Sequence, residues 1–172
     1  MSDQTEIDQL QEFLVLPIVL LAGSLFTLVL VYTAMREMKN TPRSAVHIGF
    51  DGRVHKRFSG KYAQERFDNE VRMLEYLGKQ GCDFVPKLVQ KDSEALYLVT
   101  TNAGAIVQSL SPSKLKSLFE ELESFGVVHD DPFARNVTYS TQLGRFCIID
   151  FEFAILKESG EGLRQEDVIG KK

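Results

Sequence analysis

The sequence predicts an α+β domain, in which a small antiparallel sheet packs against helices, preceded by one transmembrane helix. Three observations lead to this prediction. A long apolar run without charge lies near the N-terminus, segments with strand and helix patterns alternate after it, and a polar loop precedes the last strand pattern. The chain of 172 residues is long enough for one ordinary domain plus an appendage.

The apolar run extends from residue 13 to residue 35 and contains 23 residues without a charge. About 20 helical residues cross the hydrocarbon core of a bilayer, and a buried core helix of this length is rarely apolar on every face. A cleaved signal peptide has an apolar region of about 7–15 residues behind a positive start, whereas residues 1–12 are acidic. We therefore predict a transmembrane helix over 13–35 behind a short exported tail over 1–12.

The distribution of basic residues predicts the orientation of this helix. Residues 1–12 contain no lysine or arginine, whereas Arg36, Lys39 and Arg43 follow the run closely. Because the positive side of a membrane helix stays in the cytoplasm, we expect the N-terminus outside and the rest of the chain in the cytoplasm.

The part after the run alternates between strand and helix patterns. The pair Asp51-Gly52 between two strand-like stretches is typical of a two-residue hairpin turn. Apolar residues spaced by three and four predict a helix over 62–77 that Gly78 ends, and Ser111-Pro112 begins a second helix that Gly126 ends. The predicted order is a linker (36–44), then a domain (45–156) with a hairpin (45–50, 53–58), a helix, two strands (84–90, 95–100), a second helix and a last strand (145–149), and finally a flexible tail (157–172).

Composition excludes two classes of protein. The hydrophobic share of 44% and the charged share of 26% are those of a globular domain. With a net charge of −4 and no dominant basic face, nucleic acid is not an expected partner. Cys82 and Cys147 lack the spacing of a zinc site or a disulfide framework.

The chemically informative residues lie in the loop before the last strand and just after that strand. Residues His129 to Asn136 have the form H-x-D-x-x-x-x-N, and Asp150-Phe151-Glu152 follows the apolar strand. Upstream, Val54-His55-Lys56 precedes Glu70, which lies in the middle of the first helix. This order resembles the catalytic loop, metal-binding motif and strand lysine of the protein-kinase-like superfamily, over residues 46–154.

The resemblance implies a truncated protein-kinase-like fold and a nucleotide site. Lys56 would hold the phosphates of ATP, and Glu70 would fix Lys56 through an ion pair. Glu70 lies three residues after Phe67 on the apolar face of its helix, so its side chain is expected to point toward the sheet. No G-x-G-x-x-G motif is present, and Gly49 and Gly52 are the candidates for a reduced phosphate-binding turn.

The loop residues would carry the transfer chemistry. The resemblance assigns Asp131 to orient the acceptor hydroxyl, and Asn136 and Asp150 to hold Mg²⁺ through hard oxygen ligands. His129 would hold the loop in place, and Arg135 resembles the arginine of the tyrosine-kinase loop. The stretch from Ile149 to Ala154 is closer to the choline-kinase form of the motif, and choline kinases and aminoglycoside phosphotransferases also lack the usual arginine after the loop histidine.

Three functions follow from these patterns. The first is a membrane-anchored, minimal, kinase-like ATP-dependent phosphotransferase that acts at the cytoplasmic membrane face on a protein or small-molecule acceptor. The second is a pseudokinase, a nucleotide-binding or scaffold module without catalysis, because only 18 residues follow Ala154 and the substrate-binding helices of the family are missing. The third is a membrane-anchored adaptor without nucleotide, because the predicted phosphate-binding lid is weak.

Overall fold

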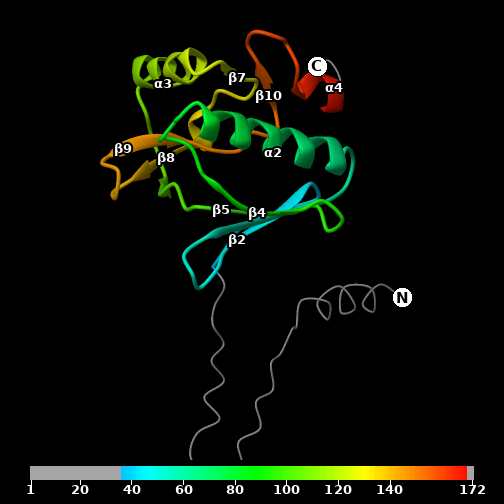
Figure 1. The fold of residues 1–172 in the computed structure, drawn as a ribbon. Coiled ribbons are helices and arrows are strands. Elements are labelled where there is room, and N and C mark those ends of the chain that lie inside the picture. The colour runs from blue at the N-terminus through cyan, green and yellow to red at the C-terminus, as the bar shows by residue number, and fades with distance from the viewer. Residues whose placement is uncertain (1–35, 170–172) are drawn as a thin grey trace, which may run out of the picture. The chain divides into compact units, whose positions relative to one another are not determined.

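The computed structural model of the protein describes residues 36–169, and these residues form an α+β fold (Figure 1). The predicted tail over 1–12 and the predicted transmembrane helix over 13–35 lie outside them. No helix within residues 36–169 is both long and apolar enough to span a bilayer. The elements are β1 (Arg36–Thr41), β2 (Ser44–Ile48), β3 (Val54–Phe58), α2 (Ala63–Lys79), β4 (Leu88–Asp92), β5 (Tyr97–Thr100), β6 (Ala105–Ile106), α3 (Pro112–Ser124), β7 (Val127–His129), the 3-10 turn η1 (Ala134–Asn136), β8 (Val137–Ser140), β9 (Arg145–Ile148), β10 (Ala154–Leu156) and α4 (Gln165–Ile169).

The strands form one larger and two smaller antiparallel sheets. The five-stranded sheet has the order β1-β2-β3-β5-β4, while β6-β8-β9 and β10-β7 form the small sheets. In Figure 1, α2 runs across the molecule between the five-stranded sheet and α3. The loop with the H-x-D-x-x-x-x-N motif begins at the end of β7 and precedes β8, and Asp150 follows β9. Both come after α2 in the sequence, whereas β3 comes before it. The fold nevertheless brings Asp150 into contact with Lys56 of β3.

The alternation of side chains along β3 decides which residues face α2. Lys56 and Phe58 are buried, whereas Arg57 between them is exposed. Lys56 pairs in register with Val46 of β2 and Leu98 of β5, so these three side chains share one face of the sheet. The strand pattern therefore directs Lys56 toward the helix.

Two buried apolar clusters hold the fold together, and α2 contributes to both. The smaller cluster lies between α2 and the five-stranded sheet and contains Phe58, Ala63, Phe67, Val71 and Leu98. The larger cluster joins the C-terminal half of α2 to α3 and the small sheets; its fully buried members include Met73, Leu77, Phe84, Leu122, Val127, Val137, Ile148 and Phe151. The helix predicted from its apolar spacing is thus the element that joins the two parts of the domain.

The assignment of residues 36–44 to a linker is wrong. This segment contains strand β1, the two-residue turn Pro42-Arg43 and the first residue of β2. The hydroxyl of Thr41 accepts hydrogen bonds from the backbone N–H groups of Arg43 and Ser44, at 3.3 and 3.1 Å. Proline marks a turn between paired strands here, because that position requires no backbone donor.

The hairpin over 45–58 is present, but its turn is longer than two residues. The backbone N–H of Gly49 donates to Arg53 O at 2.9 Å, and that of Gly52 donates to Gly49 O at 3.0 Å. Gly52 has φ of +73°, as required in a three-residue loop that ends in the left-handed conformation. The first helix likewise passes the predicted stop at Gly78 and ends at Lys79, with Gly81 at φ of +73° just beyond it.

The segment predicted as a flexible tail is ordered as far as residue 169. Leu163 N donates to Ala154 O at 3.1 Å, and Val168 on α4 is buried. Gly162 lies so close to β10 that a Cβ atom there would approach Ala154 O to 2.2 Å. The order of this segment comes from backbone contacts with β10, which its polar, glycine-containing sequence does not reveal.

Candidate functional site

A cleft of about 340 Å³ lies between the five-stranded sheet and the loop residues. It has a largely apolar wall from the sheet, where Val46, Val54 and Leu98 line it, and a polar floor. The cleft brings together five of the residues selected from the sequence, namely Lys56, Glu70, Arg135, Asn136 and Asp150, whereas Asp131 is not among its lining residues. The segment Thr100 to Gly104, which connects the sheet to β6, forms a further side.

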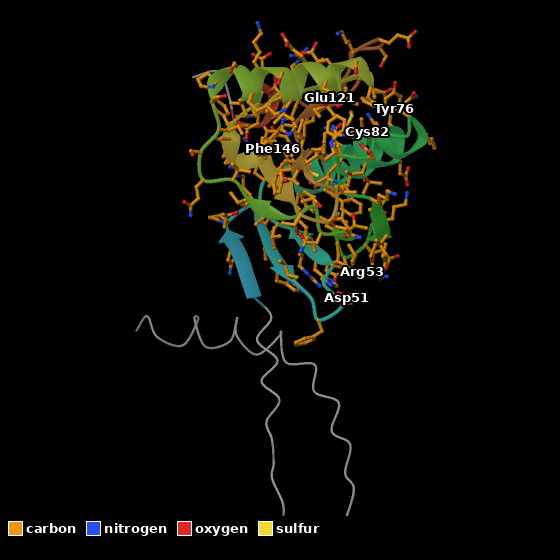
Figure 2. All side chains as sticks on the ribbon, turned by 90° about the vertical axis from the view of Figure 1, so that its left-hand side faces the viewer. Asp51, Arg53, Tyr76, Cys82, Glu121 and Phe146 are labelled. Atoms are coloured by element: carbon orange, nitrogen blue, oxygen red, sulfur yellow. The ribbon has the colours of Figure 1, made fainter. Side chains whose placement is uncertain are left out.

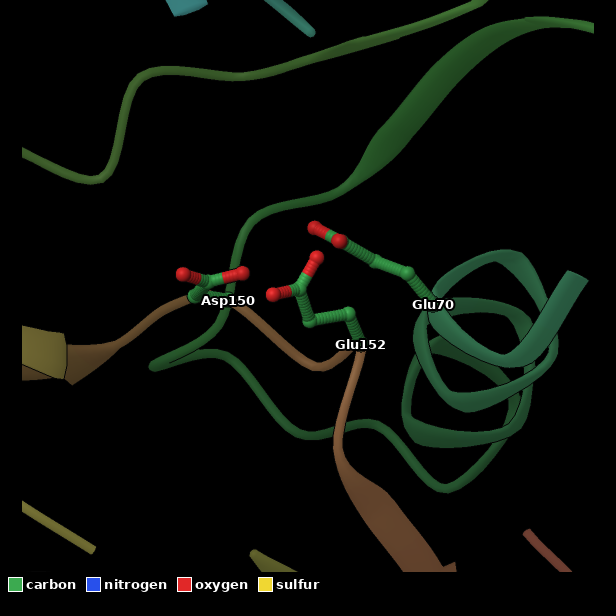
Figure 3. A group of neighbouring side chains, drawn as sticks. All are labelled: Glu70, Asp150 and Glu152. Atoms are coloured by element: carbon green, nitrogen blue, oxygen red, sulfur yellow. The ribbon is translucent and has the colours of Figure 1, made fainter. Parts of the chain in front are cut away.

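Lys56 is the centre of the polar floor. Its ammonium nitrogen Nζ lies 2.6 Å from Glu70 Oε2 and 2.6 Å from Asp150 Oδ1. A third carboxylate, that of Glu152, lies 3.7 Å from the same nitrogen. Figure 3 shows the three carboxylates converging from α2 and from the segment after β9. The lysine therefore occupies the space between acidic groups that are far apart in the sequence.

The charges in this cluster shift one another's pKa values. Burial disfavours a charged lysine, but Asp150, Glu70 and Glu152 outweigh burial and raise the pKa of Lys56 above its usual value. Burial raises the pKa of Glu70 to about 7, opposed by Lys56 and supported by the other two carboxylates. One ammonium group shared by three carboxylates thus stays charged, while Glu70 holds a proton more readily than an ordinary glutamate.

This raised pKa predicts a pH-dependent stability. Between the unfolded pKa near 4.5 and the folded pKa of about 7, the folded state binds more protons, so stability falls as pH rises. A shift of this size corresponds to about 3 kcal/mol. Glu70→Gln keeps an oxygen for Lys56 and removes the titration. We expect the stability of the variant relative to the parent to rise by up to about 3 kcal/mol from pH 4.5 to 7 and to stay level above pH 7.

The measurement is urea unfolding of both proteins at a series of pH values. Glu65→Gln is the matched control, because Glu65 is an exposed glutamate on the same helix. The control should follow the parent at every pH. A constant difference between Glu70→Gln and the parent across this window would contradict the proton linkage.

Two residues of the cluster were not selected from the sequence. Glu152 contacts Lys56 and also accepts a hydrogen bond of 3.2 Å from Arg66 Nη1. Arg66 is completely buried on α2, and it also donates to the backbone oxygens of Arg43, Ser59 and Lys61, at 3.1, 2.6 and 3.2 Å. The available signal was an arginine on the apolar face of the helix, four residues before Glu70 and next to Phe67, since a charge in that position requires a buried partner.

Asn69 fixes the segment that carries Asp150 and Glu152. Its buried side-chain nitrogen Nδ2 lies 3.0 Å from Ala154 O, 3.1 Å from Glu152 O and 3.5 Å from Phe151 O. Phe151 is fully buried in the larger apolar cluster. Asp150 itself has φ of +67°, a left-handed conformation that costs a non-glycine residue about 1 kcal/mol or more. Packing on both sides of Asp150 maintains this conformation.

His129 holds the loop against the end of β9. Its Nδ1 lies 3.1 Å from the backbone N of Asp131, and its Nε2 lies 3.2 Å from Ile149 O. Since a backbone N–H only donates, Nδ1 accepts and the proton is on Nε2, which donates to Ile149. Burial lowers the pKa of His129, which favours this neutral form. The structural position expected for His129 is the one observed.

Asp131 is surrounded by donors from its own loop. Arg135 binds both of its carboxylate oxygens, and Asn136 Nδ2 donates to its Oδ2 and to its backbone oxygen, each at 2.8 Å. Asn136 in turn accepts the backbone N–H of Ile149 at 3.0 Å through its main-chain oxygen. The turn η1 therefore brings Asp131, Asn136 and Asp150 into one connected group beside the cleft.

Gly49 and Gly52, the glycines predicted to bind the cofactor, do not line this cleft. Both lie in the loop between β2 and β3. Gly52 is needed for the turn itself, and a Cβ on Gly49 would lie 2.5 Å from the ring of His55. Ser44, the first residue of β2 after the turn that follows β1, is among the lining residues instead.

The C-terminal segment returns to the catalytic loop beside Asp131. The carboxylate of Asp130 accepts the backbone N–H of Gln165 at 2.7 Å, and Gln165 Nε2 donates to Asp130 O at 3.3 Å. Arg164 adds an ion pair to Asp130 at 3.7 Å. Asp130 therefore ties residues 164–165 to the loop.

Comparison with known proteins does not add a relative. No protein-family model matches the chain. No curated protein is similar to it in sequence either. A function for this site is therefore argued from its residues.

Proposed function

We propose that the protein is a membrane-anchored, minimal, kinase-like phosphotransferase that uses ATP at the cytoplasmic membrane face. The observation that carries the proposal is the position of Lys56, 2.6 Å from both Glu70 and Asp150 on the floor of a cleft. Phosphoryl transfer from ATP requires such an arrangement, in which one carboxylate holds a buried lysine in place and a second carboxylate faces it. The uncharged run over 13–35 supports the membrane anchor.

The donor groups at the floor fit a nucleotide with Mg²⁺. Asp150 offers a carboxylate and Asn136 an amide oxygen, since Asn136 uses its amide nitrogen on Asp131. Both are hard oxygen ligands of the kind Mg²⁺ prefers, and these two residues would hold it. When bound, the ion would neutralise phosphate charge. The apolar wall of Val46, Val54 and Leu98 is suited to a flat, weakly polar ring such as adenine.

The side chains of this protein would supply position and charge. Lys56 would exchange part of its contact with Asp150 for phosphate oxygens, while Glu70 keeps its ammonium group in place. Asp131 would accept a hydrogen bond from the acceptor hydroxyl and orient it. His129 would maintain the distance between Asp131 and the segment that carries Asp150. Because these groups are held by the fold, little reorganisation is needed on binding.

A nucleotide-binding module without catalysis is the second candidate, and one observation favours it. Arg135 binds both carboxylate oxygens of Asp131, and Asn136 occupies one of them as well. A base that is already bound to a guanidinium group is a poor acceptor for a substrate proton. Turnover requires that an acceptor displace Arg135, whereas binding of ATP does not.

Nucleotide binding is tested by thermal unfolding of the full chain in detergent. Mg-ATP at 100 times its dissociation constant is expected to stabilise the parent by about 2.7 kcal/mol. Asp150→Asn should lose most of this stabilisation and remain folded, while Asp68→Asn, an exposed aspartate on α2, should keep it. The full chain is required because a fragment beginning at Ser44 would lack the edge strand β1. Equal stabilisation of all three proteins, or none in the parent, would remove support for the site.

Catalysis is tested by ATP consumption with membrane extract as the acceptor source. Asp131→Asn is expected to lower turnover at least about 100-fold, the range typical of a positioned general base, and to leave the Mg-ATP stabilisation unchanged. Asp68→Asn should retain the parent's turnover. Equal, negligible ATP consumption in the parent and in Asp131→Asn, with Mg-ATP still bound, would decide for the module without catalysis.

A further inference from the structure

The end of the sheet at which the described chain begins is also the end that carries the β2–β3 loop. Arg36, the first residue of β1, is paired in register with Ile48, the last residue of β2. The loop Gly49–Arg53 follows Ile48 directly and extends beyond the sheet at that end. Figure 2 shows Asp51 and Arg53 at this tip, far from Glu121 on α3.

The loop is rigid through its own hydrogen bonds. Besides the two backbone bonds that close it, Arg53 N donates to Asp51 Oδ1 at 3.0 Å. The carboxylate of Asp51 also lies 3.5 Å from Arg53 Nε and 3.6 Å from His55 Nε2. The acidic charge at the tip is thus balanced by a neighbouring cation, and the conformation of the loop does not depend on Phe50.

Phe50 projects from this rigid tip into solvent. It is 68% exposed, the highest value among the large apolar side chains of the described residues. By comparison, Phe133, at 53%, is covered on one face by the guanidinium group of Arg135, 4.5 Å from the ring centre. Most of the apolar ring of Phe50 therefore lies outside the domain, where it is available for contact with another apolar phase.

We propose that this tip, led by Phe50, inserts into the lipid surface beside the membrane anchor and fixes the orientation of the domain on the bilayer. The inference rests on the proposed transmembrane helix, because residue 35 ends the predicted span and β1 begins at residue 36 without a linker. Phe50 is two residues beyond the partner of Arg36, which corresponds to roughly 7 Å along a strand. Apolar side chains that reach a membrane interface enter it to a depth of about 5–10 Å.

The polar residues at the tip suit such a surface. The charges at the tip do not repel anionic headgroups, because the half-exposed Arg53 compensates the charge of Asp51. An anchored domain without this contact would rotate freely about the strand that follows the span. With it, two points fix the sheet relative to the bilayer.

The test uses full-length protein reconstituted in phosphatidylcholine–phosphatidylserine vesicles. Phe50→Cys is labelled with an environment-sensitive nitrobenzoxadiazole dye, and quenching by lipids with a spin label near the headgroup is measured. Leu143→Cys, at an exposed apolar position (50%) on the β8–β9 turn, is the control. The two native cysteines are buried, so the dye reports the introduced one. We expect strong quenching at position 50, severalfold above position 143.

Each other result overturns the proposal, and for a distinguishable reason. Protein that leaves the vesicles in a flotation assay removes the anchor on which the proposal rests. Protein that floats with the vesicles but shows equal quenching at positions 50 and 143 contradicts the lipid contact alone. A blue-shifted dye at position 50 that lipids do not quench, and whose shift depends on protein density in the vesicle, would assign the tip to a second copy of the chain.

Discussion

Arg66→Met is expected to lower the free energy of unfolding by about 3–5 kcal/mol, the cost typical of breaking a buried ion pair. The methionine side chain fills a similar volume, so the loss comes from polar groups. The carboxylate of Glu152 loses a donor, and the backbone oxygens of Arg43, Ser59 and Lys61 lose theirs. Unfolding in urea, followed by circular dichroism, measures the change.

The control for this experiment is Arg72→Met on the same helix. Arg72 is 44% exposed and pairs with Glu161 at 3.1 Å on the surface, where an ion pair contributes about 0–1 kcal/mol. The buried arginine should therefore cost several times more than the exposed one. Similar small losses in both variants would show that water replaces the guanidinium group of Arg66, and that its four contacts contribute little.

Lys56→Met is expected to destabilise the fold by a similar amount, about 3–5 kcal/mol near pH 8, with a marked dependence on pH. Without Lys56, three carboxylates from Glu70, Asp150 and Glu152 meet in a buried site with Arg66 as the remaining cation. Loss of Lys56 removes a charge that lowers the pKa of Glu70, so Glu70 binds a proton even more tightly in the folded state. The loss should therefore shrink as pH falls toward 5, where Glu70 is protonated.

Thermal and urea unfolding of the parent and Lys56→Met at pH 5 and pH 8 measure this effect. Lys91→Met is the matched control, because Lys91 also lies on the sheet and pairs with a glutamate of α2, Glu75, but is exposed. Its effect should be about 0–1 kcal/mol at both pH values. A loss in Lys56→Met that is equal at pH 5 and pH 8 would contradict the view that carboxylate charge causes the destabilisation.

The α+β class and the internal elements were predictable because each has a local pattern. The apolar spacing in α2, the capping serine of α3 and the glycine-containing turns all depend on neighbours in the sequence. The same holds for the residues of the cleft floor, because Lys56, Glu70, Asn136 and Asp150 each stand at a motif position. What the motif could not give was their distances.

The parts that escaped prediction depend on contacts between distant segments. Strand β1 contains one apolar residue, Met38, among polar and charged ones and shows no strand alternation, and it is held by the ladder with β2. Arg66 and Glu152 are 86 positions apart, so nothing local indicates that they meet. Gly49 and Gly52 were assigned to the cofactor because they closely precede Lys56, but Ser44, at the start of β2, lines the cleft instead.

The hydrogen bonds from Asn69 to the segment after Asp150 affect how often Asp150 leaves its position in the absence of a ligand. When the segment from Phe151 to Ala154 moves, the buried side-chain amide of Asn69 loses its hydrogen bonds to backbone carbonyls, and the buried ring of Phe151 leaves the larger apolar cluster. If these changes together cost about 4 kcal/mol, fewer than roughly one molecule in 500 holds Asp150 elsewhere. Almost every molecule then already has Asp150 in its place beside Lys56, so a conformational change of this segment would not reduce the affinity of a ligand for the cleft.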